Sequence, residues 1–96
     1  MDRSLQGECA VRKLWHDLAW DQFETVQASG DRRTLRRICK LLRDIDRNGY
    51  QATGKPEPLK GNLSGWWSVR VDEKNRIVFR IDDGELVIRS CMGHYE

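Results

Sequence analysis

The chain has 96 residues, of which 39% are hydrophobic and 33% are charged, and its formal net charge is +2. This length suits one small domain. No apolar run is long enough for a membrane span or a secretory signal, which favours a cytoplasmic protein without membrane contact. Three cysteines without a C-x-x-C spacing, and two histidines far apart in sequence, predict no disulfide framework, no metal site and no cofactor.

The first ten residues, MDRSLQGECA, show no period that would bury one face. We interpret residues 1–10 as a flexible lead and residues 11–96 as a single domain. The stretch RKLW after Val11 is predicted to form a strand.

Two helices are predicted next. Asp17 is a candidate N-cap for a helix that runs to about Ala28, and Gly30 is its stop. Asp31 can then cap a second helix that runs to about Arg47. Its apolar positions lie on one face and its basic residues on the other: Leu35, Ile38, Leu42 and Ile45 against Arg33, Arg36, Arg37, Lys40, Arg43 and Arg47. The basic face suits either RNA phosphates or plain solvent.

After a loop over residues 50–65, the period changes from helical to two. Apolar residues alternate in three successive stretches, which are separated by a DEKN turn and by the hairpin signal Asp83-Gly84. These patterns predict a three-stranded antiparallel sheet. The fold class is therefore α+β, with two layers and both N-terminal helices packed on one face of the sheet.

The alternation leaves arginines on the other face of this sheet. Four of them come from the three strands: Arg70, Arg76, Arg80 and Arg89. Such a surface can bind an anion, although a solvent-exposed sheet face also needs polar residues.

Two further features suggest chemistry. Pro56 and Pro58 flank Glu57, and each proline favours an extended residue before it, so that Lys55 and Glu57 are expected to be extended and stiffly held. A stiff carboxylate suits a general base, although it could also be an exposed residue in a surface turn. His94, near the end of the chain, can exchange a proton near neutral pH. Gly93 could turn it toward the arginines.

Together these groups match the needs of RNA cleavage. A base takes the proton of a ribose 2′-OH, an acid protonates the departing 5′-oxygen, and cations stabilise the charged phosphate.

The run GKPEPLKGNLSGWWSVRV, followed by NRIVFRI and a closing HY, resembles the YoeB branch of the RelE/ParE superfamily of toxin–antitoxin toxins. The resemblance extends from Val11 to Tyr95. It implies an RNA endonuclease that cleaves mRNA in the ribosomal A site without a metal and so inhibits translation. The expected partners are a YefM-like antitoxin, the 70S ribosome with its mRNA, and a second copy in a homodimer.

The resemblance also implies roles for individual residues. The general base falls on Glu57, the phosphate-stabilising arginine on Arg76, the general acid on His94 and the terminal tyrosine on Tyr95. The residues expected to bind RNA are Lys55, Lys60, Arg70, Arg80 and Arg89.

Several positions depart from the family pattern. The stretch Glu73-Lys74-Asn75-Arg76 stands where E-E-H-R is frequent, Gly93 replaces an aromatic residue, and Glu96 follows the tyrosine. Of the adjacent tryptophans, Trp67 is in phase with the core, whereas Trp66 could stack on a base or pack against the loop.

Other functions remain open at this level. A ParE-like protein that poisons gyrase by binding would have the same fold and a basic surface, but it needs no acid and base pair. An inactive relative that acts with its antitoxin as a co-repressor, or a nuclease acting on free RNA, would also fit the fold.

Overall fold

A computed structural model describes residues 12–93 of the chain. The proposed lead, residues 1–10, and the terminal His94 and Tyr95 lie outside the described residues. Neither helix in the described range is long and apolar enough to cross a membrane.

The two helices follow the first strand, as predicted. β1 (Arg12–Trp15) leads into α1 (Asp17–Ser29), which is followed by α2 (Arg32–Asn48). Gly30 ends α1 with a φ of 78°, a left-handed conformation that glycine adopts without steric cost. Asp31 caps α2, because its carboxylate accepts a hydrogen bond from the backbone N–H of Thr34 at 3.1 Å.

The predicted N-cap of α1 was wrong by one residue. His16 occupies the cap position, its N–H bonds to the carbonyl of Ile88, and its carbonyl accepts the N–H of Trp20. The pairing of β1 therefore runs directly into the helix. Asp17 lies in the first turn instead, where a carboxylate is favoured by the helix dipole.

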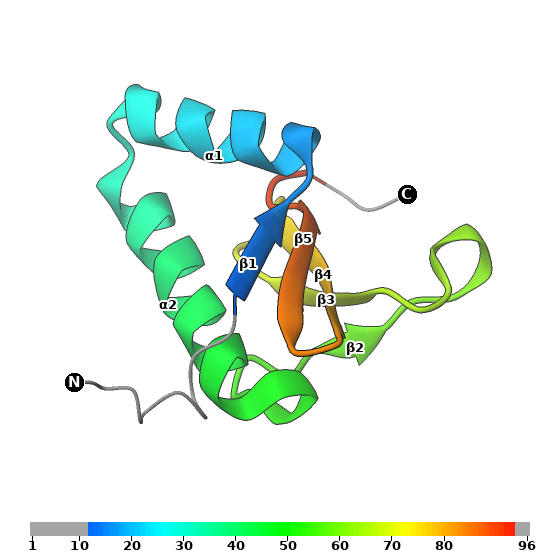
Figure 1. The fold of residues 1–96 in the computed structure, drawn as a ribbon. Coiled ribbons are helices and arrows are strands. Elements are labelled where there is room, and N and C mark those ends of the chain that lie inside the picture. The colour runs from blue at the N-terminus through cyan, green and yellow to red at the C-terminus, as the bar shows by residue number, and fades with distance from the viewer. Residues whose placement is uncertain (1–11, 94–96) are drawn as a thin grey trace.

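The sheet has five strands in the order β1-β5-β4-β3-β2. β3 (Trp67–Arg70), β4 (Arg76–Asp82) and β5 (Glu85–Ser90) form the predicted antiparallel meander. Two edge strands extend it: β1, which runs parallel to β5, and the two-residue β2 (Glu57–Pro58), which runs antiparallel to β3. The sheet is thus mixed rather than wholly antiparallel, and β5 lies inside it between β1 and β4 (Figure 1).

The main core lies between the helices and one face of the sheet. Buried residues of α1 and α2 pack there against alternating residues of the strands: Ala19, Val26, Ile38, Leu42 and Ile45 against Val69, Val71, Ile77, Phe79, Leu86 and Ile88. Cys91 joins this core, and burial raises the pKa of its thiol to about 11. Cys39 is half-buried in α2.

The opposite face of the sheet is not simply open to solvent, which corrects the sequence prediction. A second, smaller core covers part of it, formed by Trp66, Val78 and Val87, with Leu59 and Leu63 packed against them. The covering residues come from the segment 59–66, which includes a short 3-10 helix (Gly61–Leu63). Val78 and Val87, which strand alternation places on the same face as Arg76, Arg80 and Arg89, are therefore buried by this segment.

The segment between α2 and β2 is tied closely to both layers. It begins with a 3-10 helix (Gly49–Gln51), in which Tyr50 stacks on Trp67 with ring centroids 4.2 Å apart and accepts the N–H of Ile81 at 2.7 Å. At Gly54 the backbone passes so near the core that an added Cβ would lie 3.0 Å from Leu41 Cδ2 and from Val69 Cγ2. Packing thus fixes the path of the backbone that leads to Glu57.

We expect Gly54→Ala to destabilise the protein by about 1 to 3 kcal/mol, because a methyl group would overpack the contact with Leu41 and Val69. Urea unfolding measures this change. In a double-mutant cycle, Val69→Ala removes one clashing methyl group, so the double variant should lose less stability than the sum of the two single variants. Simple additivity would show that the close approach is relieved elsewhere.

Candidate active site

Glu57 lies on β2 directly opposite Ser68 of β3. Residues directly opposite in an antiparallel pair have side chains on the same face of the sheet. Ser68 in turn lies opposite Val78, whose side chain is in the second core, so Glu57 is on the face away from the helices. Its side chain is exposed and its backbone is extended, as the flanking prolines predicted.

Lys55 differs from the prediction. Its φ is 60°, in the left-handed region, rather than extended. Its N–H closes a turn by bonding to the carbonyl of Ala52 at 3.0 Å, so Lys55 is the last residue of that turn and has its positive φ despite the proline that follows. The turn brings Pro56 and Glu57 alongside β3.

Asp44 of α2 holds this turn. Its Oδ2 accepts a hydrogen bond from Thr53 Oγ1 at 2.8 Å and from the backbone N–H of Gly54 at 3.2 Å, and its Oδ1 accepts one from Asn48 Nδ2. Slight burial raises the pKa of Asp44, but the hydrogen bonds outweigh it, so the pKa lies below its ordinary value of 3.8. The carboxylate thus links α2 to the segment that carries Glu57.

Arg76 begins β4 on the same face as Glu57. It is paired with Arg70 across the strands, and its Nη1 donates to Ser68 Oγ at 3.4 Å. Ser68 is almost fully buried, with 1% of its surface exposed. Ser68 therefore lies between the two proposed catalytic residues, paired with Glu57 through the sheet and with Arg76 through its hydroxyl.

The turn before Arg76 is built on Asp72. Its Oδ1 accepts the backbone N–H groups of Lys74 and Asn75, both at 2.8 Å. The bond from Lys74 lowers the pKa of Asp72, more than its slight burial raises it. This Asx-type turn fixes the conformation in which the chain enters β4.

The chain returns to this turn after β5. The backbone N–H of Arg76 donates to the carbonyl of Gly93 at 3.1 Å, and the N–H of Gly93 donates to Asn75 Oδ1 at 2.8 Å. β5 has already ended at Ser90, and Gly93 has a φ of 76°, in the left-handed region. His94 and Tyr95 follow Gly93 in the sequence, outside the described residues.

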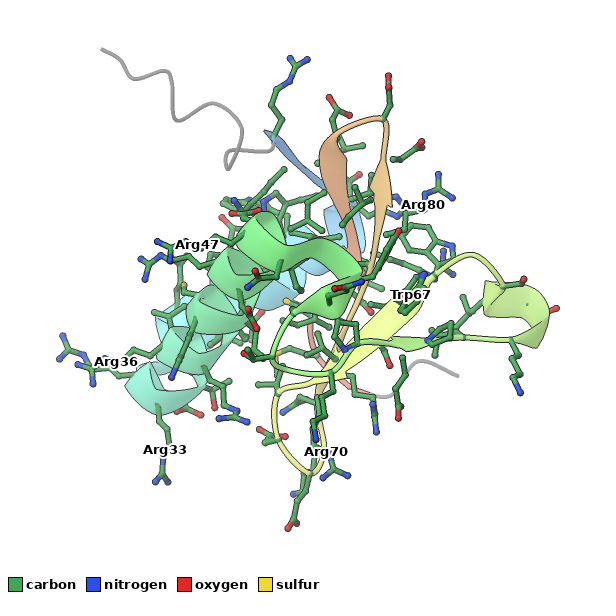
Figure 2. All side chains as sticks on the ribbon, turned by 90° about the horizontal axis from the view of Figure 1, so that it is seen from below. Arg33, Arg36, Arg47, Trp67, Arg70 and Arg80 are labelled. Atoms are coloured by element: carbon green, nitrogen blue, oxygen red, sulfur yellow. The ribbon has the colours of Figure 1, made fainter. Side chains whose placement is uncertain are left out.

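The four sheet arginines do not form one continuous surface. Arg80 and Arg89 both lie over the ring of Trp66, with their Cζ atoms 4.7 and 5.5 Å from its centroid. Arg70 instead lines a groove with α2. Figure 2 shows Arg70 at the end of β3, well away from Arg80 on β4. The sheet face thus has two groups of arginines. Arg80 and Arg89 lie over Trp66, whereas Arg70 and Arg76 lie opposite each other where β3 ends and β4 begins.

Trp66 is buried rather than available to stack on a base. Only 9% of its surface is exposed, and it packs in the second core beneath the two arginines, with the ring of His16 edge-on to it at 5.6 Å. Its partner Trp67 packs on the main core, as predicted. Lys60, another proposed RNA contact, is exposed in the same segment as Trp66.

A basic groove of about 760 Å³ runs between α2 and the 70–73 turn, and an adjoining groove of about 470 Å³ continues along α2 to Thr53 and Gly54. Arg33, Arg36 and Arg47 point outward from α2 in Figure 2. Cationic side chains dominate the walls: Arg33, Arg36, Arg37, Lys40, Arg43, Arg47 and Arg70. Arg37 also joins the two layers, since its Nε donates to the carbonyl of Val71.

The described residues supply a proton acceptor and a cation on one face of the sheet. They offer an exposed carboxylate at Glu57, a guanidinium at Arg76 on the same face, and a backbone connection from Arg76 to the residue before His94. Among residues 12–93, no group of three or more His, Cys, Asp or Glu side chains is arranged to hold a metal ion.

Sequence reasoning missed four residues that support this arrangement: Gln22, Asp44, Ser68 and Asn75. The spacing of Asp72 and Asn75 is a signal for an Asx turn that could have been recognised. Asp44 and Gln22 carried no such signal, because their partners lie ten and about seventy residues away.

Residues 15–95 match the family model described as YoeB-like toxin of bacterial type II toxin-antitoxin system. The chain is similar to Toxin YoeB of Escherichia coli K12, with 39% identity over 85 residues, which cover 88% of this chain and 100% of that protein. It is also similar to Toxin YoeB of Streptomyces coelicolor, with 47% identity over 76 residues, which cover 79% and 89%.

Solved structures agree with this likeness. A YoeB/ParE toxin from Agrobacterium tumefaciens has a TM-score of 0.82 at 35% identity, covering 88% of this chain and 99% of that one. A YoeB-YefM complex and a YoeB dimer, both from Staphylococcus aureus, give TM-scores of 0.80 and 0.79 at 35% and 36% identity, each covering 88% of this chain and 98% of the other. These neighbours share the two-helix, mixed-sheet fold.

The lowered pKa of Asp44 predicts a pH-dependent contribution to stability. The folded-state pKa lies below the unfolded one, so this contribution is complete above about pH 3.8 and is lost as the pH falls through the folded value. We expect Asp44→Asn to be less stable than the wild type at pH 7, by roughly 0.5 to 1 kcal/mol after allowance for solvent screening. Urea unfolding at pH 7 and at about pH 2.5 should show the difference shrinking on acidification. Glu24→Gln, an exposed change on α1, controls for loss of charge, and a pH-independent difference would contradict the assignment.

Proposed function

Because the chain belongs to the YoeB-like toxins of bacterial type II toxin-antitoxin systems, we propose that it is a ribosome-dependent endoribonuclease. It cleaves mRNA in the ribosomal A site and so inhibits translation. Its products are a 2′,3′-cyclic phosphate and a 5′-hydroxyl. The domain that carries this activity spans residues 11–96, after a lead of ten residues.

The proposed reaction needs a base, a cation and an acid. Glu57 takes the proton of the ribose 2′-OH, and the 2′-oxygen attacks the adjacent phosphorus. The bond from phosphorus to the 5′-oxygen breaks, and His94 gives a proton to that oxygen as it leaves. Arg76 stabilises the negative charge that gathers on the phosphate, and Tyr95 completes the site beside the acid. These groups suffice for catalysis without a metal.

One observation supports this assignment above the others. Glu57 and Arg76 lie on the same face of the sheet, and buried Ser68 lies between them, paired with both. The residue before His94 is bonded to the backbone of Arg76. A protein that acted by binding alone would need no acid and base pair beside this arginine.

The proposed RNA contacts fall into two groups around this site. Arg80 and Arg89, which Trp66 holds in place, bind backbone phosphates on the sheet face, together with Lys60 from the covering segment. Arg70 and Lys55 extend the positive surface toward α2. The basic groove along α2 suits the phosphates of ribosomal RNA, which would make ribosome binding strongly salt-dependent.

The partners proposed for this chain include an antitoxin and a second copy, because similar structures are a YoeB-YefM complex and a YoeB dimer. Three large apolar side chains are exposed in the described part of the chain, and all come from β1 and the start of α1: Leu14, Leu18 and Trp20. We place the homodimer contact there, because exposed apolar side chains gain most from being covered. The protein is expected to act in the cytoplasm.

The central test uses purified ribosomes that hold a defined mRNA, with primer extension to map the breaks. Wild-type protein should cleave at the A-site codon. Glu57→Gln and His94→Gln should each lower the cleavage rate by a factor of about 100 or more, since each removes a proton-transfer group.

A variant in the segment 59–66, which covers part of the sheet, provides a matched control for this test. Asn62→Gln changes an exposed residue there and should cleave at the wild-type rate. Wild-type cleavage by a folded Glu57→Gln variant would refute the assignment of the base. No cleavage by the folded wild-type protein would favour a gyrase-binding or co-repressor function instead.

The homodimer is tested by solution mass. Trp20→Glu should convert a dimer into a monomer, because it places a charge in the apolar contact. Light scattering coupled to size-exclusion chromatography gives the mass. Thr25→Glu adds the same charge elsewhere on the exposed side of α1 and should remain a dimer. A dimer that survives Trp20→Glu would place the contact on another surface.

A further inference from the structure

The chain leaves β5 with three consecutive backbone N–H groups bound to side chains rather than to a neighbouring strand. Gln22 Oε1 accepts the N–H groups of Cys91 at 2.8 Å and of Met92 at 3.2 Å. Asn75 Oδ1 accepts the N–H of Gly93 at 2.8 Å. Gln22 lies on α1 and Asn75 in the turn before β4, so two separate elements hold residues 91–93.

Both side chains are well placed to act as fixed supports. The amide nitrogen of Asn75 donates to Asp72 Oδ1 and Oδ2 at 3.2 and 3.1 Å, which orients its oxygen toward Gly93. Gln22 is half-buried on the rigid helix α1, and the Sγ of Cys91 donates to the carbonyl of Ala19 on the same helix. The path of residues 91–93 is therefore tied to the core on one side and to the turn that carries Arg76 on the other.

This support matters because the next residue is His94. Consecutive Cα atoms are fixed about 3.8 Å apart, so the position of Gly93 limits where His94 can be. No ladder of strand hydrogen bonds continues past Ser90 in the described chain to serve this purpose. A displacement of about 1 Å in a catalytic group can cost a factor of about 100 in rate.

We infer that Gln22 and Asn75 are positioning residues of the RNA-cleaving site: their side-chain oxygens hold residues 91–93, which lead to His94, beside the turn that carries Arg76. This inference rests on the proposed function. Neither residue touches the RNA. Each acts through the backbone that leads to the proposed acid.

A purely structural role makes a different prediction. If these bonds only satisfied backbone N–H groups, removing one would lower the melting temperature and leave the rate of the bound enzyme unchanged. A positioning role lowers kcat and leaves KM for the ribosome complex nearly constant, because binding surfaces are intact.

The test replaces Gln22 in two ways. Gln22→Leu keeps the size and removes the acceptor, and we expect kcat to fall roughly tenfold with KM within about twofold of the wild type. Gln22→Glu keeps an oxygen that can accept both N–H groups and should restore kcat to within about threefold. Gln27→Leu makes the same substitution at an exposed position of α1 and should cleave as the wild type does.

Amide hydrogen exchange by NMR reports on the contact independently of activity. Exchange at Cys91 and Met92 should be faster in Gln22→Leu and close to the wild type in Gln22→Glu.

Gly93 supplies a second pair of variants in case Gln22→Leu fails to fold. A Cβ there would meet no atom within 4 Å, so only the backbone conformation is tested. Gly93→Asn should keep most of the activity, because asparagine tolerates a positive φ, whereas Gly93→Val should lose roughly tenfold in kcat.

Two results would overturn the inference, and they differ from failure of the proposed function. Faster exchange at Met92 with kcat unchanged in Gln22→Leu would show that the contact exists but does not position the acid. Unchanged exchange would show that the contact is absent in solution. If the wild type does not cleave ribosome-bound mRNA at all, the nuclease assignment fails and this role fails with it.

Discussion

The structure depends on burial of one face of β3, β4 and β5 against α1 and α2. Side chains alternate along a strand. Packing Val69, Ile77 and Phe79 into that core therefore places Ser68 and Arg76 on the opposite face. A slip of one residue would exchange the two sets. The hydrophobic core therefore sets the register, and the register decides which polar groups meet on the other face.

The candidate site is assembled by short polar links between elements that the core has already positioned. Two aspartates do most of this work, since Asp44 holds the turn before Glu57 and Asp72 holds the turn before Arg76. Both have lowered pKa values because backbone and side-chain groups donate to them. Carboxylates thus hold the turns that lead into β2 and β4, whereas apolar contacts hold the strands on the helices. Such links are directional, which suits groups that must be aimed rather than merely buried.

Local patterns predicted the local structure well. Gly30, Asp31 and the alternation of β3 to β5 each act within a few residues, and each prediction was confirmed. Two of the errors lie where distant segments meet: the segment 59–66 folds back over Val78 and Val87, and Lys55, with its positive φ, ends a turn that is hydrogen-bonded to Asp44 of α2. β2 was missed because two residues are too few to show a period. The predicted base and arginine lie on one face, but the four arginines form separate groups, because strand alternation fixes a side and not a distance. Whether His94 and Tyr95 join them stays a prediction.

The strand order has a consequence for how the protein is made. β5 is the last strand in the sequence, yet it lies between β1 and β4 and contributes Leu86 and Ile88 to the main core. During synthesis β1 has no partner in the described sheet until β5 has emerged, and the helices have only part of their apolar surface covered. The described sheet therefore forms only after β5 has been made.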